Sequence, residues 1–462
     1  MAVPAIYEFL KEKFGAKGFG VAGGVAALVL VAPLLMGFQN WDDHSRAGHT
    51  GARDYAANFL NSVDENAIIF TYGDNDTYPL WYAQEVENIR PDVRVVNLSL
   101  IAVDWYIDLL RYRMNESPPI NLTLTRDQLR GSKRNQVPYF NQRNQARDCS
   151  KDQPISLEQF MQTIAANNPV PLQGGGSLDA QYNTCNVGIQ IDQRQLQQAP
   201  WLTPKGQQAQ GRIPVRISNS RLLKDEVAIL DIINSNLYER PIYWAVTCQQ
   251  SKLMGLENYL QLEGLGLKLT ATRNGGESRS YGIIGSGGID AEKTADLVIN
   301  QWRYGNFDKE DTHINTSYAP AIQSMQLVTL RAMNTLAQEG NTELAFEMGQ
   351  KYFEAFPNMN FPFGYQTLQM IQPYMLAREG ARIQPVLEQL ARNAADQMDF
   401  YTSLDEQTLA SSYAQDMRLT ETIITTLLRQ SRQQGNPELA ASIQAILGNY
   451  LFMAPEEQAP AQ

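Results

Sequence analysis

One short segment carries the residue types that a ligand site needs. Asp74, Asn75 and Asp76 follow an apolar, β-rich run at residues 67–72 and precede a stretch with helical periodicity. In α/β folds, ligands bind where a parallel strand ends and the next helix begins. Two carboxylates and an amide supply oxygen ligands for a hard cation, or acceptors for the hydroxyl groups of a sugar. The segment is therefore the best candidate for a binding site.

Aromatic side chains follow the acidic residues closely. Tyr78 and Trp81 are able to stack on a sugar ring, which adds to the hydroxyl-binding interpretation. The alternative is structural: Asp76 or Thr77 caps the helix, Pro79 lies in its first turn, and the carboxylates stabilise the positive end of its dipole. We favour the structural alternative.

Other chemistry has little support in the sequence. Neither a nucleophile elbow, a zinc-binding helix motif nor a phosphate loop is present, so no catalytic residue and no metal ligand is assigned. With 3 histidines in the chain, a histidine-rich metal site is not expected. No cofactor is expected either, and a divalent cation at Asp74 and Asp76 is a disfavoured alternative.

Residues 40–54 form a second segment that is dense in polar groups. One interpretation is a surface that faces a membrane, and the other is a connector whose charges pair with each other. We favour the connector. The charged and polar side chains concerned are Asp42, Asp43, His44, Arg46, Arg53 and Asp54.

The candidate segment lies within a predicted β-α-β unit. Residues 67–72 and 93–98 read as buried strands, and residues 77–89 between them have helical periodicity. Further helices are predicted at residues 51–62 and 104–114. Strand, helix and strand in this order predict a right-handed crossover and a parallel or mixed sheet.

The rest of the α/β region is less regular. Residues 115–220 are rich in Gln, Asn and Pro and read as a loop-rich insertion with isolated strands such as residues 187–191. Regular order returns with a helix at residues 224–234 and strands at 241–247 and 265–270. We therefore expect one α/β domain over residues 42–290.

From residue 291 onward the pattern is helical. The phrase GNTELA at residues 340–345 returns as GNPELA at residues 435–440, each time between two helices with apolar periodicity. Glycine supplies a tight turn between helices that bury their apolar faces on each other. The pattern predicts a tetratricopeptide-like repeat domain, or a general helical bundle, over residues 291–453, with a flexible tail at 454–462.

Composition limits the class of partner. The chain has 462 residues, a net charge of −11, 43% hydrophobic residues and 19% charged residues, which predicts folded globular regions. Because phosphate binding needs a basic face, the acidic balance argues against nucleic acid as a partner.

The N-terminal region contains an uncharged segment at residues 18–41. At about 1.5 Å per residue, a helix over residues 20–38 is roughly 28 Å long, close to the thickness of the bilayer hydrocarbon. Lys11, Lys13 and Lys17 precede it, so we predict a single transmembrane helix with residues 1–17 in the cytoplasm and the bulk of the chain in the periplasm. A cleaved secretory signal and the last helix of a longer membrane protein are the alternatives.

The chain has three cysteines, Cys149, Cys185 and Cys248. In an oxidising compartment Cys149 and Cys185 are able to pair, and whether they do is open. Cys248 follows a strongly apolar run and is expected to be buried.

The sequence from residue 40 onward resembles one family closely. The resemblance rests on three segments within residues 37–114, which are NWDDHSRAGHTGARDYAANFL, TYGDNDTYPLWYAQEVENIRPDVRVVNLSL and DWYIDLLRYRM. Two later segments are similar as well, KLMGLENYLQLEGL and the WRYGN run at residues 302–306. The family comprises large bacterial multi-pass membrane proteins of unknown function that are related to eukaryotic transmembrane protein O-mannosyltransferases. The resemblance implies a glycosyltransferase C-type membrane bundle followed by a soluble domain and helical repeats.

The chain departs from that family in one important respect. Catalysis in such transferases relies on acidic residues after the first membrane helix, and the lipid-linked sugar donor binds within the bundle. Only the last membrane helix and the soluble part have counterparts here, so no catalytic acid is carried over. The resemblance implies an extracytoplasmic accessory part that recognises acceptor protein or steadies a multi-pass partner. The alternative is a membrane-anchored periplasmic scaffold or assembly factor that acts through its repeats.

Overall fold

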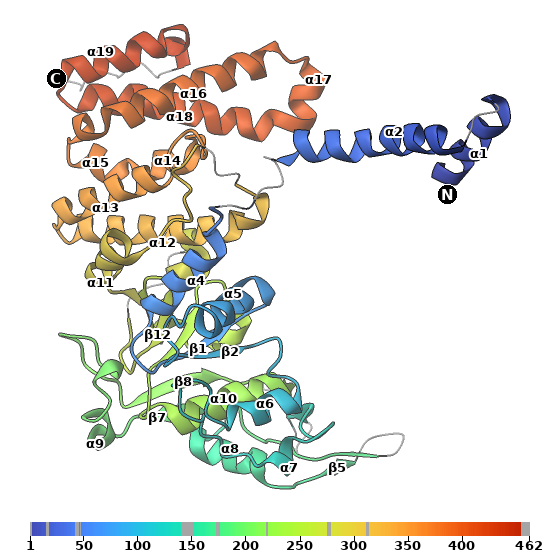
Figure 1. The fold of residues 1–462 in the computed structure, drawn as a ribbon. Helices are drawn as coiled ribbons and strands as arrows, with labels where there is room; N and C mark the ends of the chain where they lie inside the picture. The colour runs from blue at the N-terminus through green and yellow to red at the C-terminus, as the bar shows by residue number, and fades with distance from the viewer. Residues whose placement is uncertain are drawn as a thin grey trace, which may run out of the picture. The chain divides into compact units, whose positions relative to one another are not determined.

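A computed structural model describes residues 2–14, 18–41, 46, 48–139, 152–171, 176–218, 220–274, 279–310 and 314–453. Among these residues, those up to His49 form one compact unit and those from Thr50 onward form a second. The first unit consists of helices α1 (Ala2–Phe14) and α2 (Gly18–Gln39), which pack against each other (Figure 1).

The predicted transmembrane helix at residues 18–41 is not supported. Within the described ranges, no helix has both the length and the apolar character that a crossing of the bilayer requires. In α2, several glycines and Pro33 interrupt the larger apolar side chains. Glycine contributes no side-chain surface, and an internal proline removes a helical hydrogen bond.

The second unit is built around one six-stranded sheet with the order β13-β11-β12-β10-β1-β2. Its strands are β1 (Ile68–Thr71), β2 (Arg94–Asn97), β10 (Ile242–Ala245), β11 (Leu260–Glu263), β12 (Gly266–Leu269) and β13 (Gly288–Ile289). β1 pairs in parallel with both β2 and β10, and β12 is antiparallel to β10 and β11. The mixed sheet and the predicted parallel β-α-β unit are therefore confirmed.

Helices cover both faces of this sheet. α4 (Gly51–Ser62) and α5 (Asp74–Glu85) pack together on one side, and α10 (Lys224–Asn236) lies on the other (Figure 1). Because both faces are covered, all four residues of β1, β2 and β10 are buried. The chain leaves β1 through α5 on one side and reaches β10 through α10 on the other. The point between the carboxyl ends of β1 and β10 is thus a topological switch point.

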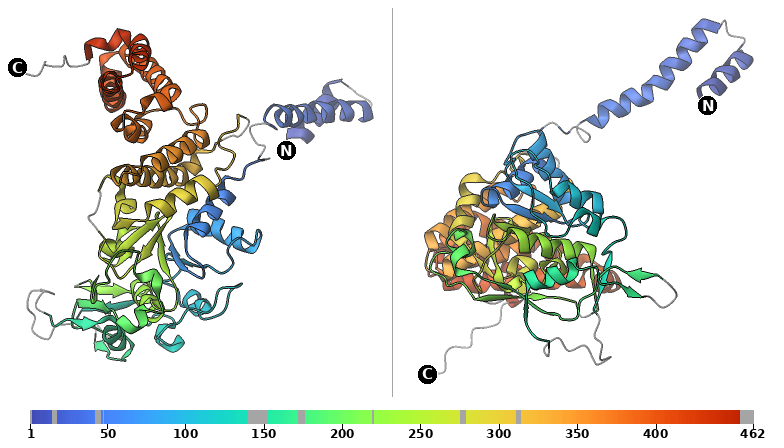
Figure 2. Two further views of the ribbon diagram at one scale, coloured as in Figure 1. Left: turned by 90° about the vertical axis from the view of Figure 1, so that its left-hand side faces the viewer. Right: turned by 90° about the horizontal axis from the view of Figure 1, so that it is seen from below.

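The segment expected to be loop-rich holds more regular structure than its composition indicated. Its helices are α7 (Arg126–Leu129), α8 (Leu157–Ala165) and α9 (Gln193–Leu196). α6 (Asp104–Leu110) precedes this segment and lies within the helix predicted at residues 104–114. The strands of the segment are β3 (Gln136–Pro138), β4 (Ile155–Ser156), β5 (Val170–Pro171), β6 (Ser177–Leu178), β7 (Asn186–Gln190) and β8 (Arg212–Arg216), and β9 (Arg221–Leu223) follows directly after it. β4, β7 and β8 form a small sheet beside α8 (Figure 2).

The C-terminal part of the second unit is helical. Its main helices are α11 (Ala291–Asp296), α12 (Ala319–Gln338), α13 (Thr342–Ala355), α14 (Tyr365–Met370), α15 (Gln372–Leu376), α16 (Gln384–Ser403), α17 (Glu406–Thr408), α18 (Ala414–Gln433) and α19 (Pro437–Ile446). Gly340 and Gly435 have φ angles of 86° and 70°, which turn the chain sharply between α12 and α13 and between α18 and α19. The predicted glycine turns are confirmed, and the tetratricopeptide assignment and the domain boundaries stay predictions.

Candidate functional site

The candidate segment opens helix α5 directly after strand β1. Gly73 has a φ of 80° and forms the turn between the two elements, a conformation that glycine adopts without steric cost. Helix α5 begins at Asp74, and it has no side-chain cap. The interpretation of Asp76 or Thr77 as the capping residue is therefore wrong. Both lie inside the helix, because the turn at Gly73 starts it three residues earlier than predicted.

Asp76 is buried at the switch point, and only 5% of it is exposed. Its Oδ2 accepts a hydrogen bond from Thr247 Oγ1, just beyond the end of β10. Burial raises the pKa of the Asp76 carboxyl to about 6. The pKa values of the Tyr55 hydroxyl and the Cys248 thiol are also raised, mainly by burial and to a smaller extent by the charge of Asp76. The charge of the buried Asp76 thus acts on a buried phenol and a buried thiol.

Threonine and asparagine side chains fix the start of α5 to the sheet. Thr77 Oγ1 donates to the carbonyl of Gly73 at 2.7 Å and lies 2.8 Å from Thr71 Oγ1. Asn97 Nδ2, at the end of β2, donates to Thr77 Oγ1 at 3.0 Å. The carboxyl ends of both strands are thereby tied to the first turn of α5, which holds the exposed residues of that turn in place.

One exposed face of α5 collects the aromatic residues. Asp74, Tyr78, Trp81 and Glu85 follow a spacing of four, three and four residues, which places them on one side of a helix. The rings of Tyr78 and Trp81 stack with centroids 5.6 Å apart. Asp74 and Asn75 are exposed, whereas Asp76 is not. The structure therefore joins Asp74, Tyr78 and Trp81 into one surface and separates Asp76 from it.

This surface suits a ligand with many hydroxyl groups better than a metal ion. An exposed carboxylate and amide accept hydrogen bonds, and the stacked aromatic pair offers a flat apolar face. Within the described residues, no group of three or more His, Cys, Asp or Glu side chains converges. Asp74 and Asp76 point to different environments, one exposed and one buried.

The described part of residues 40–54 agrees with the favoured connector. Arg53 forms ion pairs with Asp54 at 3.1 Å and with Glu87 at 3.2 Å. Asp54 is buried and also accepts hydrogen bonds from Thr50 Oγ1 at 2.8 Å and from the Gly305 amide at 3.2 Å. These charges hold α4 in place. Asp42, Asp43 and His44 lie outside the described residues.

The cysteines differ in state. Cys185 is disulfide-bonded, and Cys149 lies outside the described residues. Cys248 is a free thiol and is buried, as predicted, with its Sγ 3.3 Å from the carbonyl oxygen of Phe70.

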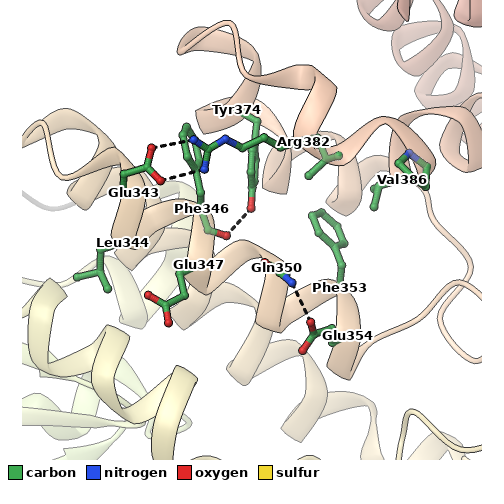
Figure 3. Close-up of a pocket in the computed structure, with 12 residues that line it drawn as sticks. Glu343, Leu344, Phe346, Glu347, Gln350, Phe353, Glu354, Tyr374, Arg382 and Val386 are labelled. Carbon is green, nitrogen blue, oxygen red and sulfur yellow. Dashed lines mark hydrogen bonds and ion pairs between the residues drawn. The ribbon is translucent and has the colours of Figure 1, made fainter.

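A groove that the sequence analysis missed lies in the helical part, between α13 and the segment from α15 to α16 (Figure 3). Its volume is about 640 Å³. Glu343, Glu347, Gln350 and Glu354 line it from α13, and Phe353 adds an apolar surface. These four polar residues repeat every three or four positions, which is the signal of one helix face. In the sequence alone, such a pattern is typical of a helix face that is simply exposed to solvent.

A stack of three side chains forms the end of this groove. The guanidinium of Arg382 lies 5.0 Å from the ring centroid of Phe346, which stacks on Tyr374 at 4.5 Å. Arg382 also holds Glu343 through two hydrogen bonds of 2.9 Å, and Tyr374 Oη donates to the Phe346 carbonyl at 2.6 Å (Figure 3). Glu347 lines the same groove (Figure 3). These contacts hold the side chains at the end of the groove, and the Glu347 carboxylate lies on the same face of α13.

Comparison with known proteins identifies one relationship. No curated protein and no solved structure matches this chain. Residues 52–292 match the family described as TMEM260-associated domain 2, which covers α4, the six-stranded sheet, the insertion and the start of α11. The matched region includes the Asp74–Trp81 surface and both strands that meet at the switch point. The chain belongs to the family defined by TMEM260-associated domain 2.

Proposed function

We propose that this chain is the extracytoplasmic, acceptor-recognising part of a membrane protein-glycosylation system of the O-mannosyltransferase type, and that it does not catalyse sugar transfer alone. The groove between α13 and α16 is the observation that carries this proposal. The groove is lined along one face of α13, and it combines carboxylates with an apolar floor. These properties suit a segment of extended polypeptide. The family relationship and the sequence resemblance supply the glycosylation context.

The groove favours polypeptides with basic residues. Glu347 and Glu354 line it as carboxylates, and Glu354 accepts a hydrogen bond from Gln350 at 3.1 Å. A lysine or arginine of the acceptor would form charge-assisted hydrogen bonds with these groups. Phe353 and Val386 would contact neighbouring apolar side chains of the acceptor.

The α5 surface adds a second element to the proposal. Asp74, Asn75, Tyr78 and Trp81 combine hydrogen-bond acceptors with an aromatic platform, which is the combination that binds a sugar ring. We assign this surface to a sugar that is already attached to the acceptor. It is a binding role, and no residue here is assigned to catalysis.

The disulfide supports the location of the chain. Disulfides persist in oxidising compartments such as the periplasm and are rare in the cytoplasm. Cys185 is disulfide-bonded, so we place the second unit outside the cytoplasm. A multi-pass membrane glycosyltransferase is the proposed partner, in keeping with the sequence resemblance and the family relationship.

A peptide-binding measurement tests the proposal. Fluorescence anisotropy with labelled extended peptides that carry two lysines should show saturable binding, and Glu347→Lys should weaken it at least about fivefold through charge repulsion. Glu339→Lys, at an exposed position just after α12, is the matched control and should bind normally. In cells that lack the native gene, the Glu347→Lys chain should also restore acceptor glycosylation less well than the control. Normal glycosylation after complete deletion of the gene would refute the proposal.

The alternative is a periplasmic scaffold or assembly factor that uses the same groove. It is favoured by the groove's position in the helical part, away from the α5 surface. The two functions differ in one outcome. Either function predicts peptide binding that depends on Glu347. Replacement of Asp74 and Tyr78 by alanine should leave glycosylation unchanged if the chain is a scaffold, and should reduce glycosylation if the chain is an acceptor-recognising part.

A further inference from the structure

A second pocket in the helical part is separate from the groove between α13 and α16. It lies between the first half of α12, the end of α13 and the segment that leads into α14, and its volume is about 610 Å³. The described residues that line it are all different from those that line the groove. Small-molecule sites commonly have volumes of about 300–1,000 Å³. The pocket is therefore large enough to hold a ligand of its own.

The lining of this pocket is uncharged. Within the described part of the chain, no charged side chain lines it, although 19% of all residues are charged. The groove, in contrast, is lined by Glu343, Glu347, Glu354 and Arg382. A charged ligand that entered the pocket would lose hydration and would gain no counter-charge. The lining thus selects for a neutral ligand.

Two side-chain amides in the pocket are available to a ligand. Gln323, on α12, and Gln366, on α14, are exposed, and neither side chain forms a hydrogen bond to another described residue. An amide group offers two donors and an acceptor, and a hydroxyl group both donates and accepts. Each of the two glutamines is therefore able to pair with hydroxyl groups of a ligand.

One aromatic ring of the lining is open to solvent. Tyr365 is 40% exposed, and its ring stacks on no other ring among the described residues. The neighbouring rings are packed into the protein. Phe361 contacts Phe356 edge-on with centroids 5.1 Å apart, and Phe363 contacts Phe353 edge-on at 5.9 Å. Tyr365 thus supplies an apolar surface beside the two amides.

Hydrogen bonds hold the wall that leads to Tyr365. Asn358 Oδ1 accepts a hydrogen bond from the Phe363 amide at 2.8 Å. Asn360 Nδ2 donates to the carbonyls of Phe307 and Lys309, at 2.9 Å each. Because this wall is fixed before a ligand arrives, less conformational entropy is lost on binding.

We propose that this pocket binds a neutral oligosaccharide, with a sugar ring against Tyr365 and its hydroxyl groups on the side-chain amides of Gln323 and Gln366. Available amides and an exposed aromatic ring in an uncharged lining match a ligand that is neutral, hydroxylated and partly apolar. A proline-rich peptide is a poorer match, because such peptides dock in grooves lined by several aromatic rings. The site is independent of the groove and of the sugar assigned to the α5 surface.

Binding of the full chain to immobilised glycans tests the class of ligand. The array should carry short neutral oligosaccharides of mannose, glucose, galactose and N-acetylhexosamines, the same glycans extended by a sialic or uronic acid, and a polyproline peptide. We expect saturable binding to at least one neutral glycan, and binding at least about tenfold weaker to its acidic counterpart, which would bring an unpaired charge. Binding to no neutral glycan, equal or tighter binding to the acidic glycans, or binding to polyproline alone would overturn the proposal.

Variants at exposed positions locate the bound glycan. Tyr365→Ala and Gln366→Ala should each weaken binding of the selected neutral glycan at least about fivefold in solution titrations. Tyr112→Ala, at a position that is 61% exposed, and Gln407→Ala, in α17, are the matched controls and should bind normally.

Tyr78→Ala, at a position that is 52% exposed, separates this pocket from the α5 surface and should also bind the glycan normally. Because all five positions are exposed, the melting temperatures of the variants should agree with that of the unmodified protein. Unchanged affinity in both pocket variants, an equal loss in the controls, or a loss in Tyr78→Ala alone would contradict the assigned site.

Discussion

Thr247 Oγ1 donates a hydrogen bond to Asp76 Oδ2 and thereby joins the end of β10 to the first turn of α5, across 171 residues of sequence. The bond lies at the topological switch point of the sheet, where α/β folds place their ligands. Here the carboxylate is buried and paired within the protein. A ligand at this edge of the sheet would therefore contact the neighbours Asp74, Tyr78 and Trp81 and not Asp76.

Asp76→Asn is expected to stabilise the protein at neutral pH. The pKa of Asp76 is raised to about 6, above the value of a free aspartate, so the folded state binds the proton more tightly than the unfolded state. Stability from this group is present at low pH and is lost as pH rises from about 4 through about 6, by up to about 3 kcal/mol. Asparagine keeps an acceptor for Thr247 and removes the charge.

Urea unfolding at several pH values measures this effect. The free energy of unfolding of Asp76→Asn should exceed that of the unmodified protein at pH 7.5 and approach it at pH 4.5. Asp74→Asn, at an exposed position in the same turn, is the control and should follow the unmodified protein. A lower stability of Asp76→Asn at pH 7.5 would show that the charged form is the stabilising one.

Glu263→Gln is expected to destabilise the sheet strongly. Glu263 is 1% exposed and pairs with Lys268 at 2.5 Å and with Lys293, and it accepts a hydrogen bond from Tyr243 Oη at 2.8 Å. Removal of the carboxylate leaves buried cations short of a partner, at a cost of roughly 3–5 kcal/mol. Glu292→Gln, at an exposed position in α11, should cost little when both variants are unfolded in guanidinium chloride.

The same network predicts a loss of stability in acid. Burial alone would raise the pKa of Asp64, but the charges of Lys268 and Lys293 outweigh it and hold that pKa at about 2. A lowered pKa contributes stability that is present above about pH 4 and is lost as pH falls toward 2. Asp64→Asn should therefore be less stable than the unmodified protein at pH 6 and nearly equal to it at pH 2. A constant difference across this range would exclude the titration of Asp64 as the cause.

Gly349→Ala is expected to disturb the end of the polypeptide groove. A Cβ at this position would lie 2.5 Å from Tyr374 Oη and 2.7 Å from Met333 Cε, so the Tyr374–Phe346 stack has to move. Overpacking of this kind costs about 1–3 kcal/mol. Gly448→Ala is the control, because its Cβ meets no atom within 4 Å. Thermal unfolding of both variants should show a clear decrease for the first only, and equal melting temperatures would contradict the predicted clash.

The parts of the fold that could be predicted are those with a long, regular pattern. The apolar runs around Ile68 and Val95, with a helix between them, indicated the parallel unit because both faces of these strands are buried. The start of α5 was misplaced, since the positive φ of Gly73 is a backbone property that periodicity does not report. In the insertion, strands of two or three residues carry no period. Ser156 and Gln159 form a capping box that could have revealed α8.

The functional residues were less accessible to sequence reasoning. Asp74, Tyr78 and Trp81 were found because they are neighbours on one helix. The groove was not found, because Arg382 and Glu343 are 39 residues apart and meet only through the packing of α13 against the following helices.

Photocrosslinking from the groove tests polypeptide recognition most directly. A photoreactive amino acid at position 350 lies in the groove, and one at position 433, at the exposed end of α18, is the control. After irradiation of intact cells, position 350 should crosslink to secreted polypeptides that carry O-linked hexose, identified by mass spectrometry, and position 433 should not. Crosslinks of equal yield from both positions, or polypeptides without any O-linked hexose, would contradict an acceptor-recognising role.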